Sequence, residues 1–156
     1  EYKDKELSYK EKELSDKKFE RKIAAKSRFK THGGSSGHDG ETKKFINMDN
    51  KVRINDIRFR VNYGLGEKKM KHEYFNKVIE KGEEIQLFIP RDGYAGNMDE
   101  VHFDITIYFS DTHNTLYKQR YVRQDMKHTV DEEPTEIIWE SFLNGKEHDF
   151  FWDVDK

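Results

Sequence analysis

The sequence contains no cysteine, only two prolines and no long apolar run. Without cysteine, the chain cannot form a disulfide framework, a thiolate metal site or a cysteine nucleophile. No window holds the roughly 18 apolar residues that a membrane-spanning helix needs. The formal net charge is −2, from 29 basic and 31 acidic residues. The chain is therefore not a uniformly basic nucleic-acid binder.

Common catalytic and phosphate-binding motifs are also missing. The sequence has no G-x-x-x-x-G-K-[ST], G-x-G-x-x-G, H-E-x-x-H or G-x-S-x-G. His102 and Asp104 share one face of a predicted strand, where such a pair can hold a proton or a metal. On the solvent face of a sheet, however, this pair is usually a cross-strand contact. We expect a protein that is not an enzyme, with no catalytic residue, no metal and no cofactor.

The apolar residues are concentrated after Phe45, and the first 44 residues are too polar to bury a core. Residues 1–31 contain no glycine or proline and predict a charged helical stalk, supported by three acid–base pairs spaced i,i+4: Glu1–Lys5, Glu6–Lys10 and Glu13–Lys17. A weak self-associating coil and a disordered segment remain as alternatives. We expect any membrane contact to come through an anchor upstream of residue 1, and favour a membrane-associated location.

The end of this predicted helix is basic. We expect contact with an anionic surface, nucleic acid or membrane, through seven residues: Lys17, Lys18, Arg21, Lys22, Lys26, Arg28 and Lys30. The alternative is a solvated helix end, where cations are favoured by the helix dipole. Residues 32–44 follow, and their glycines and serines predict a flexible linker.

After the linker, apolar residues alternate with polar ones. The alternation predicts strands over 52–63, 85–89, 101–109 and 116–123, with a phase slip at Asn55-Asp56 that indicates a bulge or bend. The last two strands form an antiparallel hairpin, which places His102, Asp104, Thr106 and Tyr108 on the solvent face. Residues 64–81 predict a short helix or an irregular excursion. This pattern favours a mainly β fold, an immunoglobulin-like antiparallel two-sheet sandwich over residues 45–156.

The C-terminal tail of this domain is acidic and aromatic, with nine acids against two lysines from residue 131 onward. Large aromatic side chains often anchor protein interfaces. We take five of them as candidate partner-binding residues: Trp139, Phe142, Phe150, Phe151 and Trp152. The alternative is that they close the core.

Residues 45–125 resemble a small β-sandwich found in many bacterial membrane-anchored proteins of unknown function. The resemblance rests on G-E-x-I-x-L-x-I-P at Gly82–Pro90 and on a later hairpin from Ile107 through Asp111 to Tyr117. The chain departs from the pattern at Gly64-Leu65-Gly66 and at His113-Asn114. The resemblance implies a single-pass anchor, a stalk and a folded sandwich, and it implies no activity.

These observations lead to one functional expectation. The chain is a non-catalytic binding or scaffolding module with a protein partner. The alternatives are a structural subunit of a larger viral or secretion assembly, and a binder of anionic surfaces or nucleic acid through residues 17–30.

Overall fold

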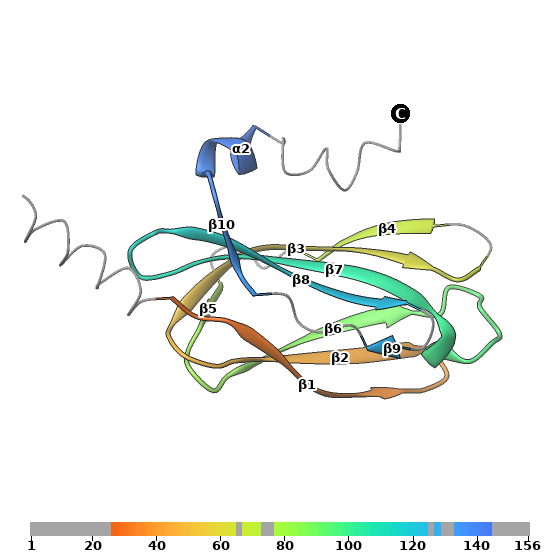
Figure 1. Cartoon of the computed structure of the whole chain (residues 1–156). Helices are drawn as coiled ribbons and strands as arrows, with labels where there is room; N and C mark the ends of the chain where they lie inside the picture. Colours follow the sequence, from red (N-terminus) through yellow and green to blue (C-terminus); the bar gives the residue numbers. More distant parts are fainter. Residues whose placement is uncertain (1–25, 65–66, 73–76, 125–126, 129–132, 145–156) are drawn as a thin grey trace, which may run out of the picture.

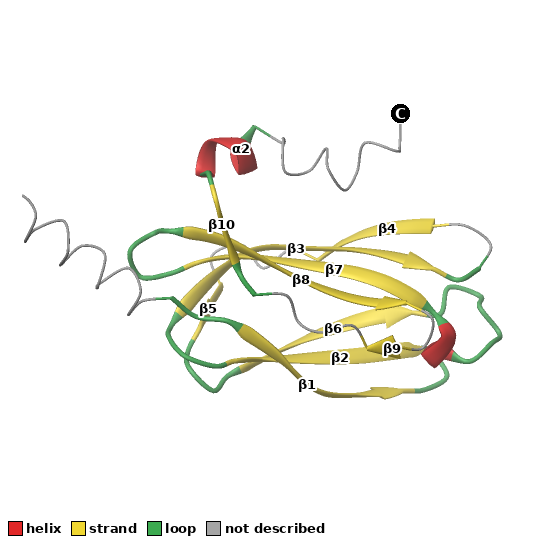
Figure 2. Cartoon of the chain, in the orientation of Figure 1, coloured by secondary structure: helices red, strands yellow, loops and turns green. Residues whose placement is uncertain are grey.

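The protein is described by a computed structural model that covers residues 26–64, 67–72, 77–124, 127–128 and 133–144. Most of these residues lie in strands (Figure 2). The strands are β1 (Phe29–Ser36), β2 (Gly40–Asn47), β3 (Val52–Asn62), β4 (Glu67–His72), β5 (Lys77–Ile79), β6 (Glu84–Pro90), β7 (His102–Ser110), β8 (Leu116–Gln124), β9 (Lys127–His128) and β10 (Thr135–Ile137). Two short helices are added, η1 (Met98–Glu100) and α2 (Trp139–Leu143).

The strands form two antiparallel sheets, as the sequence predicts. The three-stranded sheet has the order β1-β2-β6. The seven-stranded sheet has the order β10-β8-β7-β3-β4, with β5 paired to β3 and β9 paired to β8. The sheets lie one over the other (Figure 1), and buried residues from both form one hydrophobic cluster. Phe29 and Phe45 of the smaller sheet make edge-on ring contacts with Phe109 and Tyr121, at centroid distances of 5.2 and 5.6 Å.

Two sequence predictions of detail are confirmed. The register of β3 against β7 shifts between Ile54 and Asp56, which is the predicted bulge. The bulge allows apolar residues on both sides of it to face the same core. The hairpin of β7 and β8 also forms, with Phe103 opposite Arg123 and Ser110 opposite Leu116.

The predicted linker over 32–44 is wrong. This segment lies in the β1–β2 hairpin, whose register pairs Phe29 with Asn47 and Ser36 with Glu41. The glycines serve the pairing: Gly33 sits at a bulge in β1 with φ of +75°, a conformation that favours glycine. A helix to residue 31 is wrong for the same reason, because β1 begins at Phe29. The rest of the predicted stalk, residues 1–25, lies outside the described residues.

The predicted helix or irregular excursion over 64–81 is also wrong where the structure describes it. Residues 67–72 and 77–79 form β4 and β5, which pair with opposite ends of β3. The spacing of apolar residues suggested a helix, but the open edge of β3 offers backbone partners that local spacing does not report.

The outer face of the seven-stranded sheet is covered at one end. Tyr108 and Thr106 are buried, although the alternation predicts them in solvent. A second cluster explains Tyr108: Leu116, Ile137 and Phe142 pack around it, with Trp139 beside them. The C-terminal segment therefore folds back onto this sheet and gives it a small second core.

Candidate functional site

The structure places two of the predicted partner-binding aromatics in the contact between α2 and the sheet. The Phe142 ring lies 5.1 Å from that of Tyr108, and the Trp139 indole N–H donates to the Asn114 carbonyl at 2.6 Å. Both side chains hold α2 in place, as in the core alternative. Phe150, Phe151 and Trp152 lie outside the described residues.

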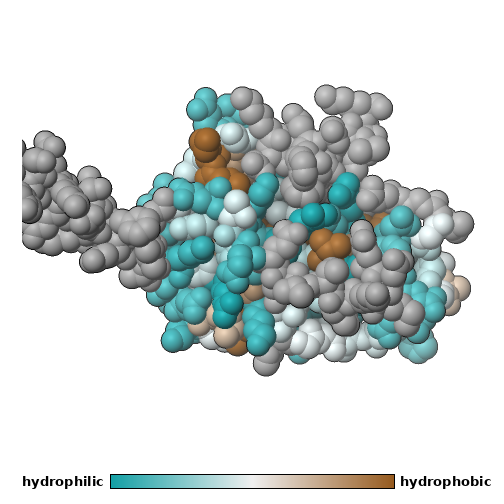
Figure 3. Space-filling model, viewed as in Figure 1, coloured by the Kyte–Doolittle hydropathy of each residue, from teal (hydrophilic) through white to brown (hydrophobic). Residues whose placement is uncertain are grey.

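The exposed apolar residues of this region lie next to Trp139 and Phe142 in the sequence. Ile138 and Leu143 are 69% and 73% exposed. Figure 3 shows hydrophobic side chains gathered over this part of the molecule. Leu143 at the end of this five-residue helix and Ile138 just before its start make a small apolar surface, of a size that occurs on many monomeric proteins.

Three of the predicted anionic-surface residues lie within the described part. Lys26 and Arg28 precede β1, and Lys30 lies on β1 with its side chain exposed. The Lys26 ammonium is 6.0 Å from the centre of the Tyr117 ring, and Arg28 forms an exposed ion pair with Glu133 at 3.6 Å. These cations do not lie on a helix end. Lys17, Lys18, Arg21 and Lys22 lie outside the described residues.

The His102–Asp104 pair has a carboxylate that is already engaged. Two guanidinium nitrogens of Arg120 donate to Asp104, the shorter bond being 2.6 Å, and Arg60 donates at 3.2 Å. Asp104 therefore bridges β3 and β8 across β7. This use fits the cross-strand contact that the spacing predicts.

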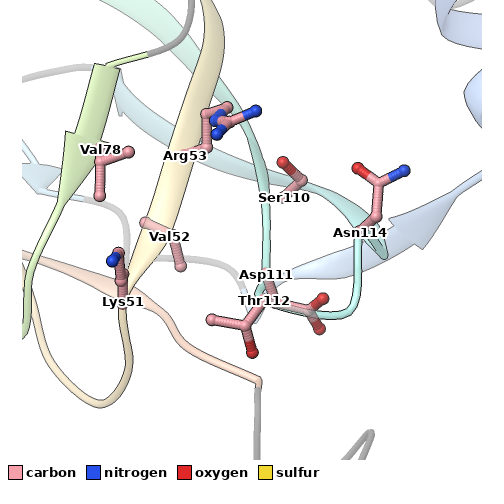
Figure 4. Close-up of a pocket in the computed structure, with 8 residues that line it drawn as sticks. All are labelled: Lys51, Val52, Arg53, Val78, Ser110, Asp111, Thr112 and Asn114. Carbon is pink, nitrogen blue, oxygen red and sulfur yellow. The ribbon is translucent and has the colours of Figure 1, made fainter.

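A hollow of about 290 Å³ lies where β3 begins, beside β5 and the turn after β7 (Figure 4). Lys51 and Arg53 line it, but both are exposed, and Lys51 pairs with Glu80 at 3.5 Å. Asp111 serves the turn, accepting from the His113 and Thr115 backbone N–H groups. The two cations that line this hollow, Lys51 and Arg53, are thus solvated rather than directed at a ligand.

Nearby, Tyr117 is buried beneath the same turn. Burial, together with the negative charges of Asp111 and Glu136, raises its pKa to about 12. The hydroxyl therefore stays protonated over the whole physiological range.

A second pocket, of about 400 Å³, lies between the two sheets on the side of β1 and β8. It exists because β1 has small residues where β2 carries large charged ones. The register places Gly34 opposite Lys43 and Ser36 opposite Glu41. Glycine and serine cannot cover these side chains, so Lys43 and Glu41 line the pocket together with Arg123 of β8.

The three charged side chains form one buried cluster. The Arg123 guanidinium donates to both oxygens of the Glu41 carboxylate, at 2.9 and 2.8 Å. It also donates to the Val101 and Met98 carbonyls at 3.1 and 2.6 Å, and its centre lies 4.4 Å from that of the Phe103 ring. All its nitrogens are thereby engaged and Arg123 is held rigidly. A bidentate pair of this geometry is among the stronger charge contacts in proteins.

Glu41 is ionised in this cluster. Burial raises the pKa of its carboxyl, but the hydrogen bonds and positive charges of Arg123 and Lys43 outweigh burial and hold the pKa below its ordinary value. The cluster thus contains two cations and one anion. Asp99, an exposed residue of η1, lies at the rim.

Lys43 is the member of the cluster whose donors the described residues do not all use. Its ammonium forms an ion pair with Glu41 at 3.0 Å and lies 5.5 Å from the centre of the Phe103 ring. An ammonium has three N–H donors, and the described residues supply one oxygen to it. Its side chain is only 9% exposed. This buried cation at the wall of a pocket is positioned to receive an oxygen acceptor.

The sequence prediction did not identify this cluster. Glu41 and Lys43 fell in the supposed linker, and Arg123 ended a predicted strand. A signal was present in the phase: Arg123 shares the period-two phase of Tyr117 and Tyr121, which face the core. Charged residues in the buried phase of a strand are candidates for a site or an internal ion pair.

The sequence matches no protein-family model, and no curated protein matches it. Within the described ranges, no group of histidine, aspartate or glutamate residues is arranged to hold a metal ion. The described helices are all too short or too polar to cross a bilayer.

Proposed function

We propose that this chain is a non-catalytic binding module whose ligand presents a carboxylate to the pocket between the sheets. The observation that supports this proposal most directly is the buried Lys43 ammonium at the pocket wall, beside an Arg123–Glu41 pair that fixes its position. Within the buried cluster two cations face one anion, while the second carboxylate of the lining, that of Asp99, lies exposed at the rim. The buried excess of positive charge favours a ligand with negative charge. The pocket supplies charged recognition groups.

Further features support the finer description of the chain. Two antiparallel sheets that share one apolar core are typical of an immunoglobulin-like sandwich. The charged, glycine-free sequence before Lys26 favours a helical stalk, and the resemblance to bacterial anchored domains favours attachment to a membrane upstream. In this proposal, the folded domain is held away from the membrane and presents its pocket to a protein partner.

The direct test uses a minimal carboxylate probe. N-acetyl-glutamate methylamide is titrated into the isotopically labelled protein while backbone amide shifts are recorded. We expect saturable shifts at β1, β2 and η1, and much smaller shifts with the glutamine analogue. Equal shifts with both probes, or none with either, would contradict the proposal.

Neighbouring lysines on β2 provide a matched pair of variants. Lys43→Met removes the buried ammonium and keeps the aliphatic stem, and we expect it to abolish binding. Lys44→Met removes a cation from the opposite face of the same strand, and we expect unchanged binding. If both variants bind alike, the pocket is not the site.

A further inference from the structure

The wall of the pocket is also the edge of a sheet. In the order β1-β2-β6, β1 pairs with β2 on one side only, among the residues that the structure describes. Gly33, Gly34, Ser35 and Ser36 are exposed along it and carry no charge. Charged side chains are a common means by which proteins block such edges. This end of β1 lacks that protection.

One residue of β1 shows how the edge can be paired. The Gln119 carboxamide, reaching from β8, accepts from the Phe29 N–H at 2.8 Å and donates to the Phe29 carbonyl at 2.7 Å. These are the two hydrogen bonds that a neighbouring strand would make with a residue of β1. A side-chain amide therefore substitutes for a strand at the start of the edge.

The register identifies which backbone groups face outward farther along. Asn47 of β2 donates its N–H to Glu83, on the side of β6. Lys43 and Glu41 share the phase of Asn47, so they also bond toward β6. Their partners in β1, Gly34 and Ser36, must then direct N–H and C=O away from β2. Their partners across the pair, Lys43 and Glu41, line the pocket, so Gly34 and Ser36 lie on its face of the sheet.

We infer that the ligand of the pocket is an extended peptide that adds as a strand to the edge of β1, with an acidic side chain directed at Lys43. The inference rests on the proposed function and specifies its partner. A peptide residue paired with Gly34 or Ser36 bonds to the outward backbone groups. Its side chain points to the same face as theirs, which is the face of the pocket. Backbone pairing supplies affinity and the charged pocket supplies specificity.

The test uses a blocked pentapeptide, acetyl-Thr-Val-Glu-Val-Thr-amide, and three modified forms of it. Methylation of the glutamate nitrogen removes the donor that faces β1. Methylation of a valine nitrogen removes a donor on the opposite edge and is the matched control. Replacement of glutamate by glutamine removes the charge and keeps the shape.

We expect the parent peptide and its valine-methylated form to bind within about twofold of each other. The glutamate-methylated and glutamine forms should each bind about tenfold more weakly or worse, because each loses a buried hydrogen bond or a charge-assisted one. Hydrogen exchange gives an independent readout. The amides of Gly34 and Ser36 should become protected on binding. The amide of Ser35 points toward β2 instead, because backbone groups alternate in direction along a strand, and its exchange rate should not change.

The outcomes separate the inference from the function on which it rests. If methylation of the glutamate nitrogen has no effect while glutamine still weakens binding, the pocket takes a carboxylate without strand pairing, and only the inference fails. If Gly34 and Ser36 are protected without peptide, another part of the chain or a second copy covers the edge, which overturns the inference. If no carboxylate probe binds, the proposed function fails as well.

Discussion

The inner face of β2 has two halves, and β1 covers them differently. At one half, Phe29 lies opposite Asn47, and large apolar side chains seal the space between the sheets. At the other half, Gly34 and Ser36 lie opposite Lys43 and Glu41, and a pocket remains. The backbone pairing is continuous except for one bulge, so the pocket comes from side-chain size on the edge strand.

The polar groups in the two halves also differ in how fully they are used. Asn47 accepts from the Ser27 hydroxyl and donates to the Asn50 and Ile79 carbonyls, so its carboxamide is satisfied. At the open half, Lys43 has donors that the described residues do not use. A satisfied buried polar group stabilises a fold, whereas an incompletely used one at a pocket is available to a ligand.

The largest expected loss of stability tests whether buried contacts stabilise the open half, where the pocket lies, as strongly as the sealed half. Arg123→Met leaves the Glu41 carboxylate buried with Lys43 alone and removes the guanidinium hydrogen bonds to the Val101 and Met98 carbonyls. We expect a loss of about 3–5 kcal/mol in the free energy of unfolding, as for other broken buried pairs. Urea unfolding monitored by tryptophan fluorescence measures it.

Arg120→Met is the control for this variant. Its guanidinium pairs with Asp104 on the outer face and is about one-third exposed. We expect a cost of about 0–1 kcal/mol, because Asp104 keeps Arg60 and solvent screens the pair. Equal costs for the two arginines would show that the inner cluster is no more critical than a surface pair.

At the sealed half, Asn47→Ala removes an amide that three groups use. We expect a loss of about 1–3 kcal/mol, since the Asn50 and Ile79 carbonyls and the Ser27 hydroxyl lose a buried partner. Asn55→Ala, at the half-buried β3 bulge, removes two longer hydrogen bonds, to the Arg53 carbonyl and the Ser110 hydroxyl, and should cost about 0.5–1 kcal/mol. Thermal unfolding of both variants compares them, and a cost for Asn47 as small as that for Asn55 would contradict the account of the sealed half.

Acid should affect the open half selectively. Because the pKa of Glu41 is lower in the folded protein than in the unfolded chain, its contribution is fully present above the ordinary carboxyl pKa of about 4.3 and is lost as the pH falls through the lower folded value. We expect the stability difference between the unmodified protein and Glu41→Gln to shrink in acid. Urea unfolding at a series of pH values checks it, and a constant difference would exclude a role for Glu41 ionisation.

The smallest effect on stability should come from Ser36→Val. A β-branched side chain suits an exposed edge strand, so we expect a change of about 0.5 kcal/mol or less. The added methyl groups enter the pocket opposite Glu41, and we expect binding of the glutamate probe to fall. Unchanged binding would show that the pocket does not depend on the small residues of β1.

Period-two alternation predicted the strands of the larger sheet well, because β3, β7 and β8 contribute alternate residues to the main core. Residues 54–57 even located the bulge, since its phase slip is visible in the apolar positions. The β1–β2 hairpin was missed because β1 buries a single large residue, Phe29, and its remaining positions are small or polar. Such a strand is stabilised by pairing with β2 rather than by its own pattern.

The candidate site was less predictable for a different reason. Glu41 and Arg123 are 82 positions apart in the sequence and meet only when both sheets form. The phase of Arg123 indicated burial, but no local pattern names its partner. Likewise, the burial of Tyr108 depends on Phe142, which returns to the sheet through β10. Contacts of this kind follow from topology, which alternation alone does not determine.

The hydrogen bonds around Ser27 have a mechanical consequence. Ser27 contacts Asn47 and accepts from the Asp49 and Asn50 amides, and Asn50 donates to the Lys26 carbonyl. If the chain is held by its N-terminal part, tension enters the domain at these residues before it reaches β1. This group of hydrogen bonds at the start of the fold would then bear the load. The far end of β1, where Gly34 and Ser36 lie, would stay unstrained.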